Sequence, residues 1–259
     1  MARLADRLGG WALLLTLVNG ALRNRVEVKK QRLAAALDYV EEVLDELGLT
    51  AFDANKSADR HCAVASTLGV SLRLLDEREL QRFAELAIFP EDDDIPLPAL
   101  EKLWRMKAVA TERLVERLLD LSLLLRFDAT RRTIRLHDVV RGFLRLSEQS
   151  PLEYGEKSLP AIHGRFLDTY GVTRWADLPA EEPYLWDELV YHLIEAERRD
   201  ELARTMTDLR YVARKTHLRD PYAAENDLIK AVEALPDEEA LRTLSGSTGL
   251  RNIFKSLRQ

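Results

Sequence analysis

Residues 123–143, LLLRFDATRRTIRLHDVVRGF, change from a strand pattern to a helix pattern within one short stretch. Two runs that favour strands, Leu123–Phe127 and Thr133–Leu136, flank a polar turn and predict a β-hairpin. From Asp138 onward the apolar residues recur at helical spacing, which predicts a helix that ends near Ser147. The stretch therefore predicts a hairpin followed directly by a helix, with His137 at the junction.

Three helices are expected before this hairpin. Asp76 is a good N-cap for the helix of residues 77–87, and the two helices that follow carry apolar residues at helical steps. These residues are Leu100, Leu103 and Trp104 in the second helix, and Leu114, Leu118 and Leu121 in the third, which Thr111 is expected to open. The acidic loop FPEDDDIPLP, residues 89–98, separates the first helix from the second, and we expect its carboxylates to be solvated. Three helices and a hairpin predict a winged helix over residues 77–148.

The N-terminal region has the pattern of a helical bundle. Its first apolar residues are spaced four and three apart, as on one face of a helix: Leu4, Leu8, Trp11, Leu15, Val18 and Leu22. A second helix is expected over residues 27–47 with Gly48 as its stop, and Ser57 or Asp59 is expected to cap a third helix. Residues 1–76 are therefore predicted to form a helical domain. Residues 149–259 begin with a polar linker and are then helical, so the fold class is mainly α, with a helical arm domain at the end.

Composition narrows the class of protein. The chain has 259 residues, a formal net charge of -6 and a single cysteine, Cys62. One cysteine excludes an intrachain disulfide and a cysteine-rich zinc site and fits a reducing compartment, so we expect a cytoplasmic protein. The N-terminal apolar run is far shorter than a membrane span, and its helical stripe continues through the point where a signal peptide would be cleaved. No membrane association is expected.

Nucleic-acid binding is disfavoured by charge. The helix that would enter the major groove, TERLVERLLDL, carries Glu112, Glu116 and Asp120 against two arginines, and these carboxylates would repel phosphates. The hairpin carries basic side chains that suit a phosphate or an acidic partner but are usually solvated: Arg126, Arg131, Arg132 and Arg135. DNA is therefore an unlikely partner, although a winged-helix DNA-binding regulator stays an alternative.

Catalytic and metal motifs are absent from the sequence. No G-x-x-x-x-G-K-[ST] loop occurs, so the chain alone does not hydrolyse nucleotides in the P-loop manner. His137 and Asp138 resemble a metal dyad, but the other histidines lack the spacing of a ligand set, so no metal is expected in this chain. His192 lies on an apolar helix and is interpreted as a packing residue. For His137 two readings stay open: a packing residue beside the helix cap Asp138, or a switch that contacts a ligand.

Three motifs occur in an order that resembles one known family. LADRLGGWALLLTLVNGALR (residues 4–23) is similar to a Gly-Leu-Pro-Leu-Ala helix, FAELAIFPEDDDIPLPALEKLW (residues 83–104) looks like the start of a winged helix, and IRLHDVVRGFLR (residues 134–145) resembles a Met-His-Asp motif. Together they resemble the segment that follows the P-loop domain in NB-ARC proteins, signalling NTPases of the STAND class. Ala12 stands in the position of the family's proline, and Leu136 in that of its methionine.

The resemblance implies a role for specific residues. It implies that His137 contacts the β-phosphate of ADP, that Asp138 supports it, and that Trp11 and Ala12 lie where the family contacts adenine. ADP or ATP would bind only together with a P-loop nucleotide-binding domain, which is missing from this chain. The resemblance thus implies a regulatory, ADP-sensing segment that is not an enzyme on its own, with protein partners bound through the helical arm in apoptosis-like signal transduction. A plain helical protein-interaction scaffold is a further alternative.

Overall fold

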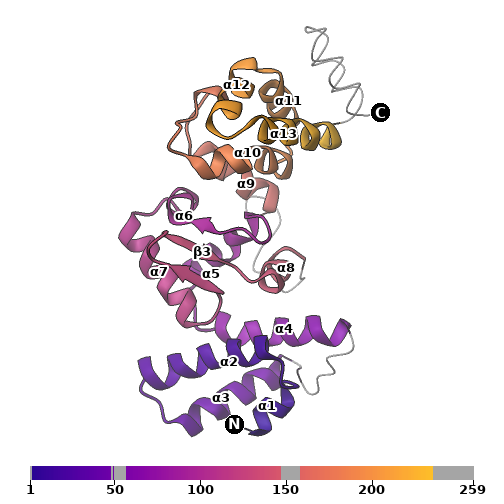
Figure 1. The fold of residues 1–259 in the computed structure, drawn as a ribbon. Helices are drawn as coiled ribbons and strands as arrows, with labels where there is room; N and C mark the ends of the chain where they lie inside the picture. Colours follow the sequence, from indigo (N-terminus) through magenta and orange to yellow (C-terminus); the bar gives the residue numbers. More distant parts are fainter. Residues whose placement is uncertain (1, 48, 50–56, 147–157, 236–259) are drawn as a thin grey trace. The chain divides into compact units, whose positions relative to one another are not determined.

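A computed structural model describes residues 2–47, 49, 57–146 and 158–235. The described residues are mostly helical, with one small antiparallel sheet, which confirms the predicted fold class (Figure 1). The chain divides into two compact units, Met1–Tyr154 (unit 1) and Gly155–Gln259 (unit 2). The further division of unit 1 at residue 76 stays a prediction. No helix within the described ranges has both the length and the apolar character needed to cross a membrane.

Four helices begin unit 1. They are α1 (Ala2–Arg7), α2 (Ala12–Arg23), α3 (Leu33–Glu46) and α4 (Ser57–Leu72). The single helix expected through residues 4–22 is wrong, because Gly9 and Gly10 take φ values of 60° and 64° and end α1 before α2 begins. The predicted apolar face is buried only in part: Leu4, Leu8, Val18 and Leu22 are buried, whereas Trp11 and Leu15 are half-buried. α2 packs against both α3 and α4 (Figure 1).

The second predicted helix begins later than expected. α2 continues into a π-helical turn, Asn24–Val28, and the chain then turns at Lys30, whose φ is 55°. α3 therefore begins at Leu33 rather than near residue 27, and it ends at Glu46, close to the predicted end. The predicted stop Gly48 lies outside the described residues. α4 begins at Ser57, so Ser57 is the first residue of the helix rather than the predicted cap before it.

The second half of unit 1 follows the predicted order of elements. These elements are α5 (Glu77–Glu85), a 3-10 turn (Leu86–Ile88), β1 (Ile95–Pro96), α6 (Leu97–Trp104), α7 (Ala108–Asp120), β2 (Arg126–Asp128), β3 (Thr133–Arg135) and α8 (Asp138–Leu146). Asp76 caps α5 as predicted: its carboxylate accepts the Glu79 N–H at 2.8 Å, and the Glu79 carboxylate accepts the Asp76 N–H at 3.0 Å. The predicted start of α7 at Thr111 is wrong, because Ala108 begins the helix and Thr111 is buried within it.

The sheet contains one strand more than the predicted hairpin. β2 and β3 pair antiparallel with Phe127 opposite Ile134, which confirms the hairpin, although β2 begins at Arg126 rather than at the predicted Leu123. β1 adds to the other edge of β3, with Ile95 also opposite Ile134, so the order is β1-β3-β2. The acidic loop before β1 is thereby held beside the hairpin.

Close backbone contacts hold α2, α4 and the end of α7 together. A Cβ atom placed on Gly20 of α2 would lie 2.5 Å from the carbonyl carbon of Leu121, so only glycine permits this approach. The buried Ser71 hydroxyl of α4 donates to the Leu121 carbonyl oxygen at 3.2 Å. Arg117 of α7 donates to the Leu74 carbonyl oxygen at 2.6 Å and pairs with Glu79 at 2.7 Å. The first four helices and the sheet-bearing half are therefore joined through specific polar contacts.

Unit 2 is helical, as predicted. Its helices are α9 (Leu159–Asp168), α10 (Pro183–Glu195), α11 (Arg199–Thr207), α12 (Leu209–Leu218) and α13 (Pro221–Ala234), with a 3-10 turn at Trp175–Asp177. α10 is the central helix and contacts α9, α11 and α13 (Figure 1). It buries Leu185, Trp186, Leu189 and Leu193 among these neighbours.

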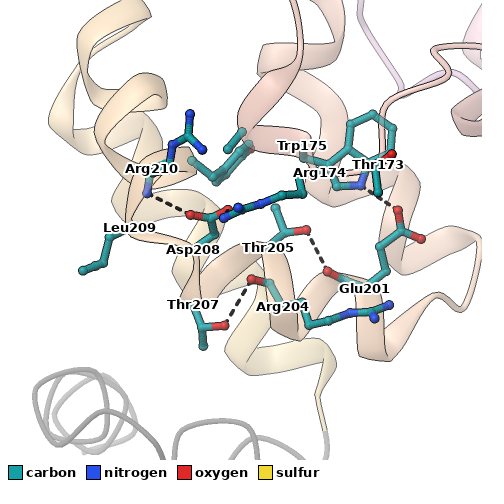
Figure 2. Close-up of a pocket in the computed structure, with 12 residues that line it drawn as sticks. Thr173, Arg174, Trp175, Glu201, Arg204, Thr205, Thr207, Asp208, Leu209 and Arg210 are labelled. Atoms are coloured by element: carbon teal, nitrogen blue, oxygen red, sulfur yellow. Dashed lines mark hydrogen bonds and ion pairs between the residues drawn. The ribbon is translucent and has the colours of Figure 1, made fainter.

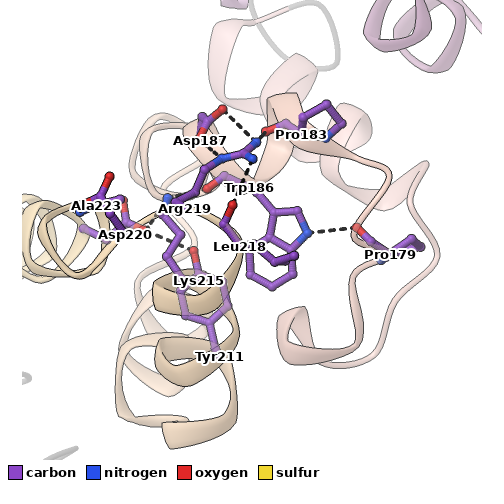
Figure 3. Close-up of polar contacts among 11 residues, drawn as sticks. Pro179, Pro183, Trp186, Asp187, Tyr211, Lys215, Leu218, Arg219, Asp220 and Ala223 are labelled. Carbon is purple, nitrogen blue, oxygen red and sulfur yellow. Dashed lines mark hydrogen bonds and ion pairs between the residues drawn. The ribbon is translucent and has the colours of Figure 1, made fainter.

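Polar contacts fix α12 and the loop that follows it onto α10 (Figure 3). Lys215 is buried, donates to the Trp186 carbonyl oxygen and pairs with the buried Asp227 of α13 at 2.9 Å. Arg219 reaches both carboxylate oxygens of Asp187, at 2.5 and 3.0 Å. The Lys215–Asp227 pair thus lies deep in the core of unit 2, and the Arg219–Asp187 pair lies nearer its surface.

Candidate functional site

His137 is the residue that caps α8. Its ring Nδ1 accepts the backbone N–H of Val139 at 3.2 Å, and its carbonyl oxygen accepts the N–H groups of Val140 and Arg141 at 2.8 and 3.0 Å. The expectation that Asp138 is the cap is wrong: Asp138 is the first residue of α8 and is exposed. The turn from β3 into α8 places the imidazole, one residue earlier, in the capping position.

The capping contact fixes the chemistry of the other ring nitrogen. A neutral imidazole carries one proton, and because Nδ1 accepts a hydrogen bond, that proton lies on Nε2. His137 is half-buried, and its Nε2 has no hydrogen-bond partner among the described residues. The contact with α8 therefore selects the tautomer of the neutral ring that carries an N–H donor at Nε2. No hydrogen bond among the described residues joins Asp138 to His137; the Asp138 carboxylate favours the first turn of α8 through the helix dipole.

α8 connects this histidine to the loop before β1. The buried Arg141 donates to the Phe89 carbonyl oxygen at 2.6 Å and to the Glu91 carboxylate at 2.7 Å. Arg145 donates to the Ala87 carbonyl oxygen at 3.2 Å. α8 also contacts α4 (Figure 1). The helix that begins at the predicted sensor is thus anchored to two other parts of unit 1.

Trp11 and Ala12 lie at the beginning of α2. Trp11 occupies the N-cap position with extended backbone, and its side chain is half-buried. Ala12 is the first residue of the helix and is exposed. No hydrogen bond or ring contact within the described ranges links either residue to His137. The structure thus places the three predicted site residues in one compact unit, on two different elements.

The arginines of the hairpin are paired with carboxylates. Arg126 meets both carboxylate oxygens of Asp94 at 2.8 Å, and the other three have acidic neighbours as well. These pairs are Arg131–Asp128 at 3.9 Å, Arg132–Glu101 at 2.9 Å, and Arg135 with Asp92 at 3.6 Å and Asp94 at 3.9 Å. The expectation that the acidic loop and the arginines are separately solvated is wrong. Because each positive charge already faces a negative one, the hairpin is a poor surface for phosphates.

Two buried histidines form a polar chain inside unit 2. The Nδ1 atoms of His163 and His192 lie 2.8 Å apart, and the Tyr184 hydroxyl lies 2.8 Å from His192 Nε2. Burial, and secondarily the neighbouring His163, holds the pKa of His192 well below its usual range. The prediction that His192 is a packing residue is confirmed. Among the described residues no group of three or more histidine, cysteine, aspartate or glutamate side chains is placed to hold a metal ion.

A hollow on unit 2 was not predicted from the sequence. It has a volume of about 890 Å³ and lies between the loop Thr173–Ala176, α11 and the start of α12 (Figure 2). Three exposed arginines line it, Arg174, Arg204 and Arg210. We call it the arginine hollow. Three separate segments supply its wall, so no single stretch of sequence indicates it.

The acidic groups of the arginine hollow hold its wall in place. Asp208 accepts from Arg174 at 2.8 Å and from the Arg210 backbone N–H at 3.0 Å. Burial opposes ionisation of Asp208, but these two contacts outweigh it and lower the pKa of the carboxyl group. Glu201 accepts the indole N–H of Trp175 at 2.7 Å. Both carboxylates therefore have partners within the wall.

Comparison with known proteins identifies the helical region. Residues 159–247 match the family described as the APAF-1 helical domain. Apoptotic protease-activating factor 1 from Danio rerio is 24% identical over 181 residues, which cover 69% of this chain and 14% of the relative. The Homo sapiens protein of the same name is also 24% identical over 181 residues, covering 68% of this chain and 14% of the relative. The chain thus spans about a seventh of the length of these relatives. Residues 159–247 are therefore similar to a helical domain of apoptotic protease-activating factor 1.

Proposed function

We propose that the chain is a regulatory segment of a STAND-type NB-ARC signalling protein, not catalytic on its own, in which His137 senses ADP. The observation that carries the proposal is the capping contact of His137, because it leaves Nε2 as an N–H donor. The similarity of residues 159–247 to the APAF-1 helical domain supports the same role for the chain as a whole. We further propose that the protein works in the cytoplasm and that unit 2 binds protein partners.

The residues present fit part of an ADP site. His137 suits a phosphate oxygen, since a neutral imidazole N–H donates well to an anion. The half-buried ring of Trp11 suits the flat face of adenine, whereas Ala12 offers only a methyl group. The remaining phosphate contacts would come from a P-loop domain, which supplies backbone N–H groups and a lysine. ADP would then favour the arrangement in which both parts contact it.

Ligand binding at His137 would affect the rest of unit 1 through α8, the helix that His137 caps. A ligand held by Nε2 favours the ring orientation in which Nδ1 caps the helix. That helix is fixed to the Phe89 carbonyl oxygen through Arg141 and to the Ala87 carbonyl oxygen through Arg145. ADP would therefore bias a helix that is anchored to residues 87–89, and a population shift requires that ADP bind this arrangement more tightly than another one.

Two substitutions of His137 separate sensing from capping. Asparagine is among the best N-cap residues, so His137→Asn retains the cap and removes the second ring nitrogen, whereas His137→Ala removes both. The chain is expressed together with its P-loop domain, and ADP affinity is measured by calorimetry alongside the free energy of unfolding. Loss of one hydrogen bond to a charged group corresponds to about tenfold weaker ADP binding or more, which we expect for both variants.

The outcome that rejects sensing is equally specific. If His137→Asn binds ADP as the unmodified chain does, then His137 is only a helix cap. The interaction-scaffold alternative would then describe the chain better. A loss of stability in His137→Ala alone, of about 1 kcal/mol, is expected in either case because the cap is removed.

A further inference from the structure

We infer that the arginine hollow of unit 2 binds an acidic segment of a partner protein, with one carboxylate at Arg204 and an apolar side chain against Leu209. This inference deepens the proposed partner-binding role of unit 2. It does not involve His137 or a nucleotide.

Arg204 is the cation available to a ligand. Its side chain is exposed, and its Nε donates only to the backbone carbonyl oxygen of Asp200, at 3.2 Å. No carboxylate within the described residues pairs with it. Arg174, by contrast, is paired with Asp208 at 2.8 Å, and Arg210 lies 3.8 Å from Asp177. A carboxylate that approaches Arg204 therefore displaces no existing ion pair.

Leu209 supplies an apolar contact beside this cation. Its side chain is 68% exposed and belongs to the lining of the hollow, so an apolar side chain of a ligand can reach it. Its backbone is fixed, because Asp208 caps α12 through the Arg210 N–H. Figure 2 shows the Arg174 side chain lying across the hollow toward Asp208, with Leu209 beyond Asp208 at one end and Arg204 below, toward the other end. A ligand that satisfies both must be extended and amphipathic, as a peptide segment is.

The charges that line the hollow select a carboxylate. Asp208 pairs with Arg174 and Asp177 lies 3.8 Å from Arg210, so among the described residues Arg204 is the arginine of the lining whose charge no carboxylate balances. One carboxylate neutralises this charge. A phosphate with nearly two negative charges would leave an excess of negative charge close to Glu201 and Asp208. The balance therefore favours an aspartate or glutamate side chain of a partner over a phosphorylated one.

The wall is already ordered before a ligand arrives. The Trp175 indole N–H donates to Glu201, and Arg214 donates to the Ala176 carbonyl oxygen at 2.6 Å. These contacts hold the loop of residues 173–176 against α11 and α12. A preformed wall lowers the entropy lost on binding, which makes an interaction through few contacts feasible.

The full chain is titrated with a blocked peptide of alternating leucine and glutamate residues, by calorimetry and by ¹⁵N NMR. We expect saturable binding with shifts at the amides of Arg204 and Leu209. Arg204→Glu is expected to weaken binding roughly fivefold or more, because a local attraction becomes a repulsion. Leu209→Ser is expected to weaken it at unchanged charge. The matched control is Arg199→Glu, an exposed position on the same helix outside the hollow's lining, which is expected to bind as the unmodified chain does.

Three results would overturn the inference. The first is absence of saturable binding, or equal binding of the same peptide with glutamine in place of glutamate. The second is an equal loss in Arg199→Glu, which would indicate attraction to net charge alone. The third is inorganic phosphate that shifts the same amides and displaces the peptide, which would assign the hollow to phosphorylated partners. None of these measurements uses ADP, so the nucleotide proposal can fail or stand independently.

Discussion

The ion pair between Lys215 and Asp227 gives the sharpest test of the unit 2 core. Its side chains are only 2% and 5% exposed, and the two charged groups lie 2.9 Å apart. Asp227→Leu leaves the Lys215 ammonium group buried without a counter-charge and with the Trp186 carbonyl oxygen as its remaining partner. Breaking a buried pair in this way costs about 3–5 kcal/mol, a large part of the 5–15 kcal/mol that typically separates a folded from an unfolded domain.

Removal of the other partner, in Lys215→Met, is expected to lower the free energy of unfolding by less. Burial raises the pKa of Asp227 even though Lys215 acts in the opposite direction, so desolvation outweighs the attraction at this carboxyl group. In Lys215→Met the carboxyl group can therefore take up a proton and remain hydrogen-bonded to the Tyr211 hydroxyl, which lies 3.1 Å away. The double variant Lys215→Met/Asp227→Leu no longer buries any charge. Its free energy of unfolding is therefore expected to equal that of the unmodified chain or to exceed it by about 1–4 kcal/mol.

Urea unfolding at pH 7 measures all three variants. Near-UV circular dichroism reports on this core directly, since the stacked rings of Trp186 and Tyr211 lie 5.5 Å apart within it. The control is Asp187→Leu, which breaks the partly exposed pair with Arg219 and should cost no more than about 1 kcal/mol. If Asp227→Leu costs as little as the control, or if the double variant is as unstable as Asp227→Leu, the reasoning from burial is refuted.

Two further predictions concern other parts of the fold. Gly20→Ala is expected to destabilise the chain by about 1–3 kcal/mol because its Cβ would meet the Leu121 backbone. The control, Gly142→Ala, places a Cβ with nothing within 4 Å and is expected to be neutral or stabilising. Equal changes in the urea midpoints of the two variants would contradict the close contact at Gly20. The depressed pKa of His192 means that below about pH 6.5 the unfolded chain binds a proton that the folded chain does not, so stability falls by up to about 1.4 kcal/mol per pH unit as pH decreases. His192→Leu should flatten this dependence between pH 7 and pH 5 and His217→Gln should not; identical slopes in both variants would exclude His192 as the cause.

Local patterns predicted most of the helices and the hairpin. The cap of α5 at Asp76 was predicted because a good capping residue directly precedes the apolar pattern, whereas the reciprocal contact of Glu79 was not. Periodicity did not reveal the break between α1 and α2, because the apolar stripe keeps its helical steps on both sides of Gly9 and Gly10. The cap of α8 was assigned to Asp138 because aspartate is a common N-cap residue. Which of two neighbouring residues takes that position depends on the turn after β3, and the sequence does not specify that turn.

Contacts between distant segments were the least predictable. Asp94 and Arg126 are 32 residues apart, and only the pairing of β1 with β3 brings the acidic loop to the hairpin. A two-residue strand ending in Pro96 gives almost no alternation to detect. The arginine hollow requires the relative placement of a loop and two helices, so Arg204 looked in the sequence like any other surface arginine.

The Nδ1 atom of His137 caps α8, and this contact also fixes the orientation of the ring. The ring cannot turn without withdrawing the acceptor from the Val139 N–H, and the first turn of α8 then loses its cap. Arg141 of the same helix donates to the Phe89 carbonyl oxygen, 52 residues earlier in the chain. A rotation of the His137 side chain therefore removes one of the contacts that fix α8, the cap at its first turn. The cap of α8 and the direction in which Nε2 points are therefore set by the same imidazole ring.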